Sequence, residues 1–180
     1  MAELRVEIST LELLAKDARL PERIAHMIND AYGYRRVTAS EVRNRVEKSD
    51  GSCCANRVLH IAWCGDQLAG CCSSTVQPPF TCCGCGHWGL LSVCPTMQGT
   101  GVASALIAAA EDRLAQAGCI AVQIEYEYRE GDEFCERLRQ WYEGTLGFSC
   151  TTGSSFRICH KWLRPARCSP SCCRCLCTVC

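Results

Sequence analysis

The chain has 180 residues and a mass of 19.8 kDa, which is the size of one domain with or without a short tail. Nineteen basic and nineteen acidic residues give a formal net charge of zero, so net charge provides no general attraction to nucleic acid. The composition, 48% hydrophobic and 21% charged, is that of a folded domain and excludes disorder over most of the chain. The uncharged stretch 67–110 is broken by prolines and glycines, so it does not predict a membrane span.

The first third of the chain predicts one strand followed by helices. Leu4–Ile8 alternates apolar and polar residues, as a half-buried strand does. The capping-box pattern Ser9–Glu12 predicts a helix start, and Pro21 is suited to the first turn of a second helical segment. A second capping box, Thr38–Glu41, predicts a helix that continues to about Lys48.

The rest of the chain predicts a hairpin, a central strand and alternating helices and strands. Strands are expected over 58–64, 68–76, 87–94, 120–128, 148–152 and 156–163, and helices over 102–117 and from 130 to about 144. The order is then β-α-α-β-β-β-α-β-α-β-β, an α+β domain with a mixed sheet, followed by a Cys-rich tail over 165–180. The uncharged stretch 67–110 is expected at the centre of that sheet.

A glycine loop, Gln98-Gly99-Thr100-Gly101, lies between the central strand and the helix that begins near Val102. Glycines allow close approach of the backbone to a ligand, and the first amides of a helix favour an anion such as phosphate. The loop lacks the Gly-Lys-Ser/Thr ending of a Walker A loop and the glycine spacing of a dinucleotide-binding fold. A plain strand-to-helix turn remains the alternative interpretation.

The segment Leu91–Ala103 resembles the acyl-CoA loop of the GNAT superfamily of N-acetyltransferases, whose pattern is Gln/Arg-x-x-Gly-x-Gly/Ala. Gln98, Gly101 and Ala103 fit that pattern, and Trp141–Phe148 resembles the later Tyr-Glu…Gly-Phe segment of the family. The resemblance covers residues 3–164. It implies a GNAT-like, mixed, mostly antiparallel central sheet flanked by helices, with the coenzyme between two splayed central strands.

The resemblance also implies acetyl-CoA as co-substrate and a coenzyme site around the glycine loop. Backbone groups would bind the pantetheine arm and polarise the thioester carbonyl, at Leu91, Ser92 and Val93. The pyrophosphate would be held by the loop and the helix start, at Gln98, Gly99, Thr100, Gly101, Val102, Ala103 and Ser104. Many loops of the family carry a Lys or Arg, and this one has none, so binding would depend on amides and the helix dipole.

Tyr142 occupies the family's Tyr position and is the candidate acid for the departing thiolate. Four residues separate it from Gly147 where the family usually has three, and Gly144 is expected to absorb the extra residue in a turn. A packed, half-buried tyrosine is the alternative. His87 is the candidate general base, and the alternative is a histidine at a strand edge that has no role. Glu125 and Glu127 are fallback bases.

Cysteine is the unusual residue, with 19 in 180. The charged start of the chain lacks the apolar run of a signal peptide. With the resemblance, this favours a reducing compartment, mostly free thiols and buried packing roles for Cys64, Cys94 and Cys119. Of Cys71 and Cys72, one is expected to face inward and one outward. A metal at Cys82/Cys85 and lipidation at Cys177 are alternatives, and no metal is expected.

The sequence therefore predicts an N-acetyltransferase that moves an acetyl group from acetyl-CoA to a primary amine. The acceptor, a small molecule or a protein amine, is left open. A non-catalytic acyl-CoA-binding module and a Cys-rich metal-binding protein are the alternatives. No nucleic acid and no transmembrane segment are expected, a homodimer is left open, and the cytoplasm, with the nucleus as alternative, is the expected location. The five basic residues of the acid-free stretch 149–180 are expected to be solvated.

Overall fold

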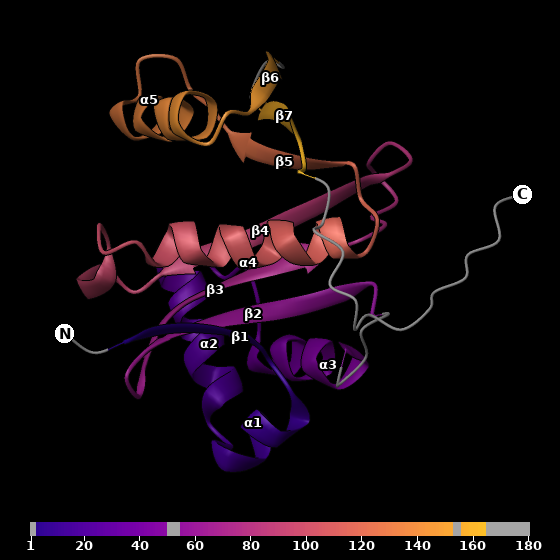
Figure 1. Ribbon diagram of the computed structural model, residues 1–180. Helices are drawn as coiled ribbons and strands as arrows, with labels where there is room; N and C mark the ends of the chain where they lie inside the picture. The colour runs from indigo at the N-terminus through magenta and orange to yellow at the C-terminus, as the bar shows by residue number, and fades with distance from the viewer. Residues whose placement is uncertain (1–2, 50–54, 153–155, 165–180) are drawn as a thin grey trace, which may run out of the picture.

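The computed structural model describes residues 3–49, 55–152 and 156–164 of the chain (Figure 1). Its strands form one seven-stranded sheet with the order β1-β2-β3-β4-β5-β7-β6. They are β1 Leu4–Ile8, β2 Arg57–Cys64, β3 Gln67–Thr75, β4 Cys85–Val93, β5 Ala121–Glu127, β6 Ser149–Thr152 and β7 Phe156–Trp162. In these pairings β4 and β5 are parallel and the other neighbours antiparallel. This confirms the predicted α+β fold with a mixed, mostly antiparallel sheet.

The helices follow the predicted order, including the break before Pro21, which divides the first helical region into two helices. They are α1 Leu11–Lys16, α2 Leu20–Tyr32, α3 Ala39–Ser49, the 3-10 turn η1 Pro95–Met97, α4 Val102–Gln116, α5 Glu133–Arg139 and the π-helix η2 Gln140–Thr145. Three helices therefore separate β1 from β2, because the chain leaves helical geometry at Asp17 and α2 starts at Leu20, with Pro21 in its first turn. The Thr38–Glu41 capping box is present, since Glu41 accepts from the Thr38 amide. The first helix starts where it was expected, but its cap is Thr10, whose Oγ1 accepts from the Leu13 amide, rather than Ser9 with Glu12.

Two hydrophobic clusters lie on the two faces of the sheet. One joins α1, α2 and α3 to β2 and β3, and the other joins α4 and η2 to the central strands, β5 and β7. Cys71 belongs to the first cluster and Cys72 to the second, and both are fully buried. The expectation that one of them faces outward was wrong, because β3 is covered on both faces.

Helix α4 lies along β3 and β4 in the middle of the molecule (Figure 1). The uncharged stretch 67–110 contains β3, β4 and the start of α4, so it lies at the centre of the sheet as expected. A Cβ added at Gly70 of β3 would lie 2.9 Å from side-chain atoms of both Val102 and Leu106. One added at Gly86 of β4 would lie 2.7 Å from the side chain of Leu114. The two glycines therefore allow α4 to pack close to the sheet along its whole length.

The described cysteines are mostly free thiols, as expected, with one exception. Cys150 of β6 and Cys159 of β7 are paired across the two strands and joined by a disulfide. Cys119 is buried, as expected, whereas Cys64 and Cys94 are only half-buried. Cys177 and the other tail cysteines lie outside the described residues. Within the residues described, no helix has the length and apolar character needed to cross a bilayer.

The two basic residues of β7 are paired rather than solvated. Arg157 is paired with Glu143 at 3.3 Å, and Lys161 with Glu111 at 2.7 Å. These pairs tie β7 to η2 and to α4. The expectation of solvated charges was therefore wrong for Arg157 and Lys161. Arg164 is exposed, and Arg167 and Arg174 lie outside the described residues.

A buried polar cluster fastens α4 to β2 and β3. His60 Nε2 lies 2.8 Å from Ser74 Oγ, and Arg113 donates to the same Oγ at 3.0 Å. Because Arg113 already donates to that oxygen, the serine hydroxyl is free to donate to a neutral His60. Burial, and then the nearby Arg113 charge, lower the pKa of His60 to about 4.

We predict that this histidine makes the protein less stable in mild acid. In the unfolded chain His60 binds a proton near its ordinary pKa of 6.5, which the folded state rejects until about pH 4. The free energy of unfolding therefore falls as pH drops from 6.5 to 4, by up to about 3 kcal/mol from this group. Urea unfolding at several pH values should show a shallower pH dependence for His60→Gln. Equal slopes for the two proteins would contradict the assignment.

Candidate active site

The two central parallel strands separate soon after they pair. Strands β4 and β5 are in register at Cys85–Ala121, Gly86–Val122 and His87–Gln123. Beyond His87 no further pair is formed, although β4 runs on to Val93 and β5 to Glu127. The result is a fork that opens toward the carboxyl ends of both strands. This is the splayed arrangement that the sequence resemblance implied.

A bulge in β4 lies at the start of the fork. Leu90 is the only non-glycine residue with positive φ in the described chain, at 53°, and the β3–β4 register shifts beside it. The Cys94 amide donates to the Ala69 carbonyl of β3. Since backbone groups of an extended strand alternate in direction, those of Val93 and Leu91 face the fork. Ser92 lies differently: its backbone turns toward β3, its side chain is buried, and its Oγ donates to the Leu90 carbonyl.

The glycine loop brings an uncapped helix start to the open end of the fork. Gly99 and Gly101 have φ values of 77° and 90°, and a Cβ at either would meet nothing within 4 Å. Helix α4 begins at Val102 with no side chain capping it and no acid in its first turn. Its first amides are therefore available to an anion. The exposed residues here are Gln98, Gly99, Thr100, Gly101 and Ser104, whereas Val102 is buried and Ala103 half-buried.

The predicted acid, Tyr142, lies in an aromatic cluster on the α4 face of the sheet. Its ring centroid is 4.9 Å from that of Tyr126, 6.0 Å from Trp88 and 6.4 Å from Phe148. The side chain is 9% exposed, and no described residue makes a hydrogen bond to its hydroxyl. Burial raises the pKa of Tyr142 well above its ordinary value, so the phenol keeps its proton.

The extra residue after Tyr142 is accommodated by a π-helix. Helix η2 spans Gln140–Thr145, and the Leu146 amide donates to the carbonyl of Trp141, five residues earlier. A single inserted residue in an α-helix produces this wider turn. The insertion was expected to be absorbed in a turn at Gly144. Instead the widened helix keeps Tyr142 against the sheet.

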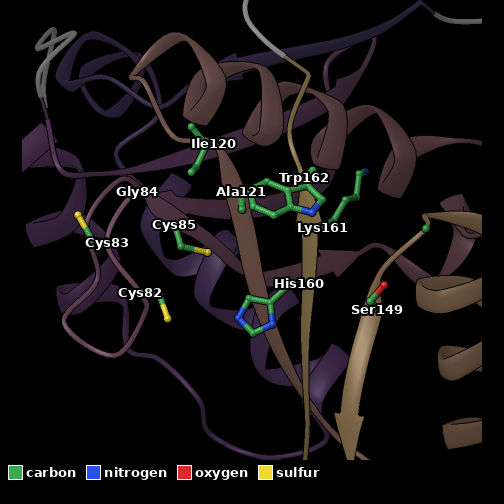
Figure 2. Close-up of a pocket in the computed structure, with 11 residues that line it drawn as sticks. Cys82, Cys83, Gly84, Cys85, Ile120, Ala121, Ser149, His160, Lys161 and Trp162 are labelled. Atoms are coloured by element: carbon green, nitrogen blue, oxygen red, sulfur yellow. The ribbon is translucent and has the colours of Figure 1, made fainter.

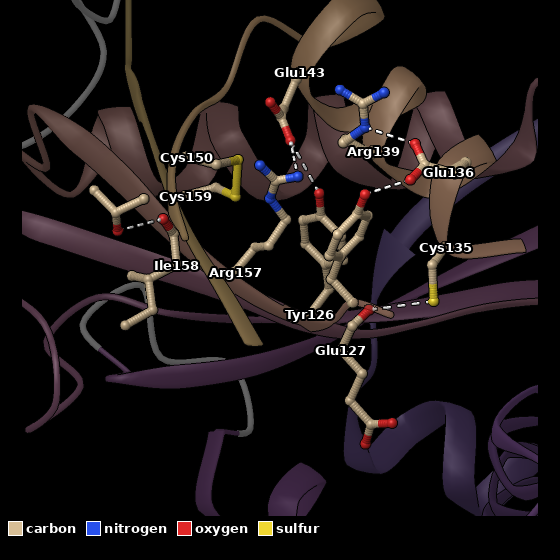
Figure 3. A network of polar contacts seen from close by, with 12 residues as sticks. Tyr126, Glu127, Cys135, Glu136, Arg139, Glu143, Cys150, Arg157, Ile158 and Cys159 are labelled. Atoms are coloured by element: carbon tan, nitrogen blue, oxygen red, sulfur yellow. Dashed lines mark hydrogen bonds and ion pairs between the residues drawn. A yellow bond between two sulfur atoms is a disulfide. The ribbon is translucent and has the colours of Figure 1, made fainter. Parts of the chain in front are cut away.

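Polar contacts hold η2 on β5 and β7 (Figure 3). Tyr126 donates to Glu143, which is also paired with Arg157 of β7. Burial, and then the Glu143 carboxylate, raise the pKa of Tyr126 to about 12. Glu143 directly follows Tyr142, so the position of the candidate acid depends on this network. The sequence prediction missed it, because its members lie on three separate elements.

The predicted base, His87, lies at the last β4–β5 pair, on the other face of the sheet. Its Nδ1 lies 2.9 Å from the Gln123 carbonyl, which can only accept, so Nδ1 carries the proton. The free Nε2 points along β4 toward Gly89, where an added Cβ would lie 2.9 Å from it. Burial lowers the pKa of His87, against the opposing effect of the Gln123 carbonyl. The neutral ring thus presents a free lone pair at the fork.

The two candidate catalytic residues lie on opposite faces of the sheet. Trp88, next to His87 in β4, faces the α4 cluster with Tyr142, so His87 faces the other way. Glu125 lies on the His87 face, accepts from Gln123 Nε2 at 3.1 Å and is exposed, as is Glu127. The fork therefore has the candidate acid on one side and the candidate base on the other.

Tyr32, the last residue of α2, packs against the cluster of α1, α2 and α3, in the region from Tyr32 to Arg36 where the sequence led us to expect the acceptor. Burial raises its pKa to about 12, and the pKa of Tyr142 is affected by Tyr32 and by Cys72. Tyr32 belongs to the α1–α3 face of the sheet, whereas Tyr142 belongs to the α4 face.

No three His, Cys, Asp or Glu side chains in the described parts of the chain lie close enough to hold a metal ion. Cys82, in the turn before β4, and Cys85, the first residue of β4, are both free thiols.

A sequence model described as the acetyltransferase (GNAT) family matches residues 22–154. No curated protein matches the chain. Similar solved structures include a GNAT-family acetyltransferase from Streptococcus pneumoniae, with TM-score 0.66, 14% identity and coverage of 90% of this chain and 100% of the other.

Two further structures were determined with coenzyme A. The PaiA N-acetyltransferase of Thermoplasma acidophilum has TM-score 0.62 and 14% identity, covering 89% of this chain and 99% of the other. The NatC complex bound to Gag peptide and CoA has TM-score 0.66 and 16% identity, covering 90% of this chain and 99% of the other. At these identities the likeness establishes the fold.

We predict that the Tyr142 hydroxyl contributes little to stability. Because no described group bonds to it, Tyr142→Phe should change the free energy of unfolding by less than about 0.5 kcal/mol. Tyr126→Phe removes the donor to Glu143 and should cost about 1–2 kcal/mol. Urea unfolding of the two variants and the wild type measures both. A large loss for Tyr142→Phe would show that this hydroxyl has a structural bond.

Proposed function

The chain belongs to the acetyltransferase (GNAT) family, and on this premise we propose that it transfers an acetyl group from acetyl-CoA to a primary amine. The observation that carries the proposal is the fork between β4 and β5, which opens directly onto the glycine loop and the uncapped start of α4. This arrangement combines a slot for an extended chain with an anion site at its end.

The residues of this chain fit the coenzyme in three respects. The fork-facing backbone of Leu91 and Val93 can pair with the amides of a pantetheine arm, as a neighbouring strand would. The open loop from Gln98 to Gly101 and the first amides of α4 can receive a pyrophosphate, with Ser104 beside them. When bound, acetyl-CoA supplies a thioester whose carbonyl carbon is open to attack by an amine.

Two side chains would then handle the protons. His87 Nε2, free and neutral, accepts the proton of the attacking amine, directly or through water. Tyr142, protonated throughout the physiological range, donates to the departing thiolate from the opposite face of the sheet. The Glu143–Arg157–Tyr126 contacts keep Tyr142 in place without touching the reacting atoms.

The acceptor is an amine of a small molecule or of a protein. Solved relatives support both classes: one structure contains a peptide with coenzyme A, and another is an aminoglycoside 6'-N-acetyltransferase complexed with coenzyme A. We place the reaction in the cytoplasm, with the nucleus as alternative. The nine free thiols among the described cysteines support that location, and the Cys150–Cys159 disulfide does not.

We predict that acetyl-CoA stabilises the protein through the start of α4. At a hundredfold excess over its dissociation constant it should raise the melting temperature by about 5–10 °C. Gly101→Glu, which adds bulk and negative charge at the pyrophosphate, should abolish that shift.

Gly118→Glu is the matched control, since Gly118 ends the same helix with a φ of 89° and equally open surroundings. Both variants carry the same backbone strain, so each is compared with and without coenzyme. No stabilisation of the wild type by acetyl-CoA would refute the proposed function.

We predict that His87 and Tyr142 contribute to turnover and not to coenzyme binding. His87→Gln and Tyr142→Phe should each lower kcat by about a hundredfold, while the acetyl-CoA melting shift persists. Since burial lowers the His87 pKa, the acid limb of kcat/KM should lie below pH 6.5 and disappear in His87→Gln. Mass spectrometry of the acetylated amine is the measurement, because released-thiol dyes react with the protein's cysteines.

Coenzyme binding without turnover of any amine, and with no effect of either substitution, would favour a non-catalytic acyl-CoA-binding module of this fold. A stoichiometric copurifying zinc whose removal unfolds the domain would favour the Cys-rich metal-binding alternative.

A further inference from the structure

One face of the sheet is covered by α1, α2 and α3 only over part of its width, and the cluster that joins these helices to the sheet contains no residue of β5, β6 or β7. On that side β7 instead exposes three large apolar side chains, Phe156, Ile158 and Trp162, at 52%, 40% and 77%. They are paired with Glu127, Glu125 and Ala121 of β5 and so share one face with them. We call this surface the open face.

One end of the open face is hollowed into a cavity of about 290 Å³ (Figure 2). Its walls include Cys82 from the turn before β4, Cys85 at the start of β4, Ile120 and Ala121 at the start of β5, and His160 and Trp162 of β7. Lys161 also borders it, but its Nζ is bound to Glu111 on the far side of the sheet. A cavity of 150 Å³ can already hold a benzene ring, so this one has room for an aromatic or long aliphatic side chain.

The cavity is distinct from the proposed coenzyme site. It lies at Cys85, the first residue of β4, whereas the glycine loop follows Val93, the last residue. Eight residues of strand separate them by about 26 Å. It does share a face with the candidate base, because Cys85 and His87 lie two residues apart on the same side of β4.

The exposed charges of the open face beside β7 are acidic, and Arg57 of β2, which donates to Thr75 opposite His87, contributes a positive charge near His87. Glu125 and Glu127 are exposed beside Ile158 and Phe156, whereas the cavity end is mainly apolar. An amine that reaches His87 from this side passes these carboxylates, which favour a cation. From Ala121 at the cavity to Glu125 at the fork, four residues of strand span about 13 Å, which an extended peptide also covers with about four residues.

We propose that the open face binds the acceptor, and that the acceptor is an extended polypeptide whose large apolar side chain enters the cavity about four residues from the acetylated amine. Basic side chains next to the amine face Glu125 and Glu127. The inference rests on the proposed function and names the substrate class of the same site. It explains why three apolar side chains remain exposed on a strand that adjoins the fork.

Peptides with a free N-terminal amine and basic flanking residues test the proposal on the full chain. One series carries Phe at the fifth position, four residues from the amine, and its matched series carries Ser there. Wild-type kcat/KM should be about tenfold higher for the Phe series. Cys82→Phe, which fills the cavity from its exposed rim, should bring the ratio of the two series to about one. Cys82→Ser, which removes the thiol without filling the space, should keep it at about ten.

The charge contribution has its own test. Glu127→Gln should raise KM for basic peptides several-fold, and Glu47→Gln, at an exposed site on α3, should not. A ratio of one in the wild type, or turnover of small amines only, overturns the inference and leaves the proposed function standing. Failure of acetyl-CoA to stabilise the protein refutes the proposed function itself.

Two other occupants of the open face would also overturn the inference. A dimer in solution that Trp162→Arg dissociates, with no peptide preference, assigns the face to a second copy. A loss of thermal stability on removal of residues 165–180, with no peptide preference, assigns it to that segment.

Discussion

Three cross-strand pairs hold β4 against β5, and the candidate site depends on the pairing ending there. Had it continued past His87 and Gln123, the backbone edges of Leu91 and Val93 would be occupied by β5 and closed to any ligand. The bulge at Leu90 shifts the β3–β4 register where the strands separate, and the Gln123 carbonyl accepts from His87 at the last pair. The three pairs from Cys85 to His87 thus join the two halves of the sheet, and their end at His87 leaves the rest of β4 unpaired on its β5 side.

The two sides of the fork are supported by different cores. Helices α1–α3 pack on β2 and β3, and α4 with η2 packs on the central strands, β5 and β7. Gly70 and Gly86 bring α4 close to the sheet, so its uncapped start stays at the fork while its far end is buried at Leu114. The Glu143–Arg157 pair extends this support to Tyr142. The site is therefore assembled on rigid elements rather than on the loops alone.

Local patterns made the element order predictable, because capping boxes, turn residues and periodicity act within a few positions. The glycine loop identified the coenzyme region in the same way. Features set by cross-strand register were not predictable: the open side of β4, the burial of both Cys71 and Cys72, and the Cys150–Cys159 disulfide. The extra residue after Tyr142 is visible in the sequence, but the sequence does not show that it changes the hydrogen bonding of the helix and produces a π-helix. The opposed faces of His87 and Tyr142 follow from strand parity and a shared cluster, which need the structure.

The placement of Tyr142 and His87 on opposite faces of one sheet has a kinetic consequence under the proposed function. Coenzyme and acceptor would arrive from different sides and meet only within the fork, so neither would block the entrance of the other. Both would then be bound together before reaction, in a ternary complex, and neither product would have to wait for the other to leave. Double-reciprocal plots of the initial rate at several fixed concentrations of the second substrate would then intersect rather than run parallel. Each product would compete mainly with the substrate that enters from the same face of the sheet.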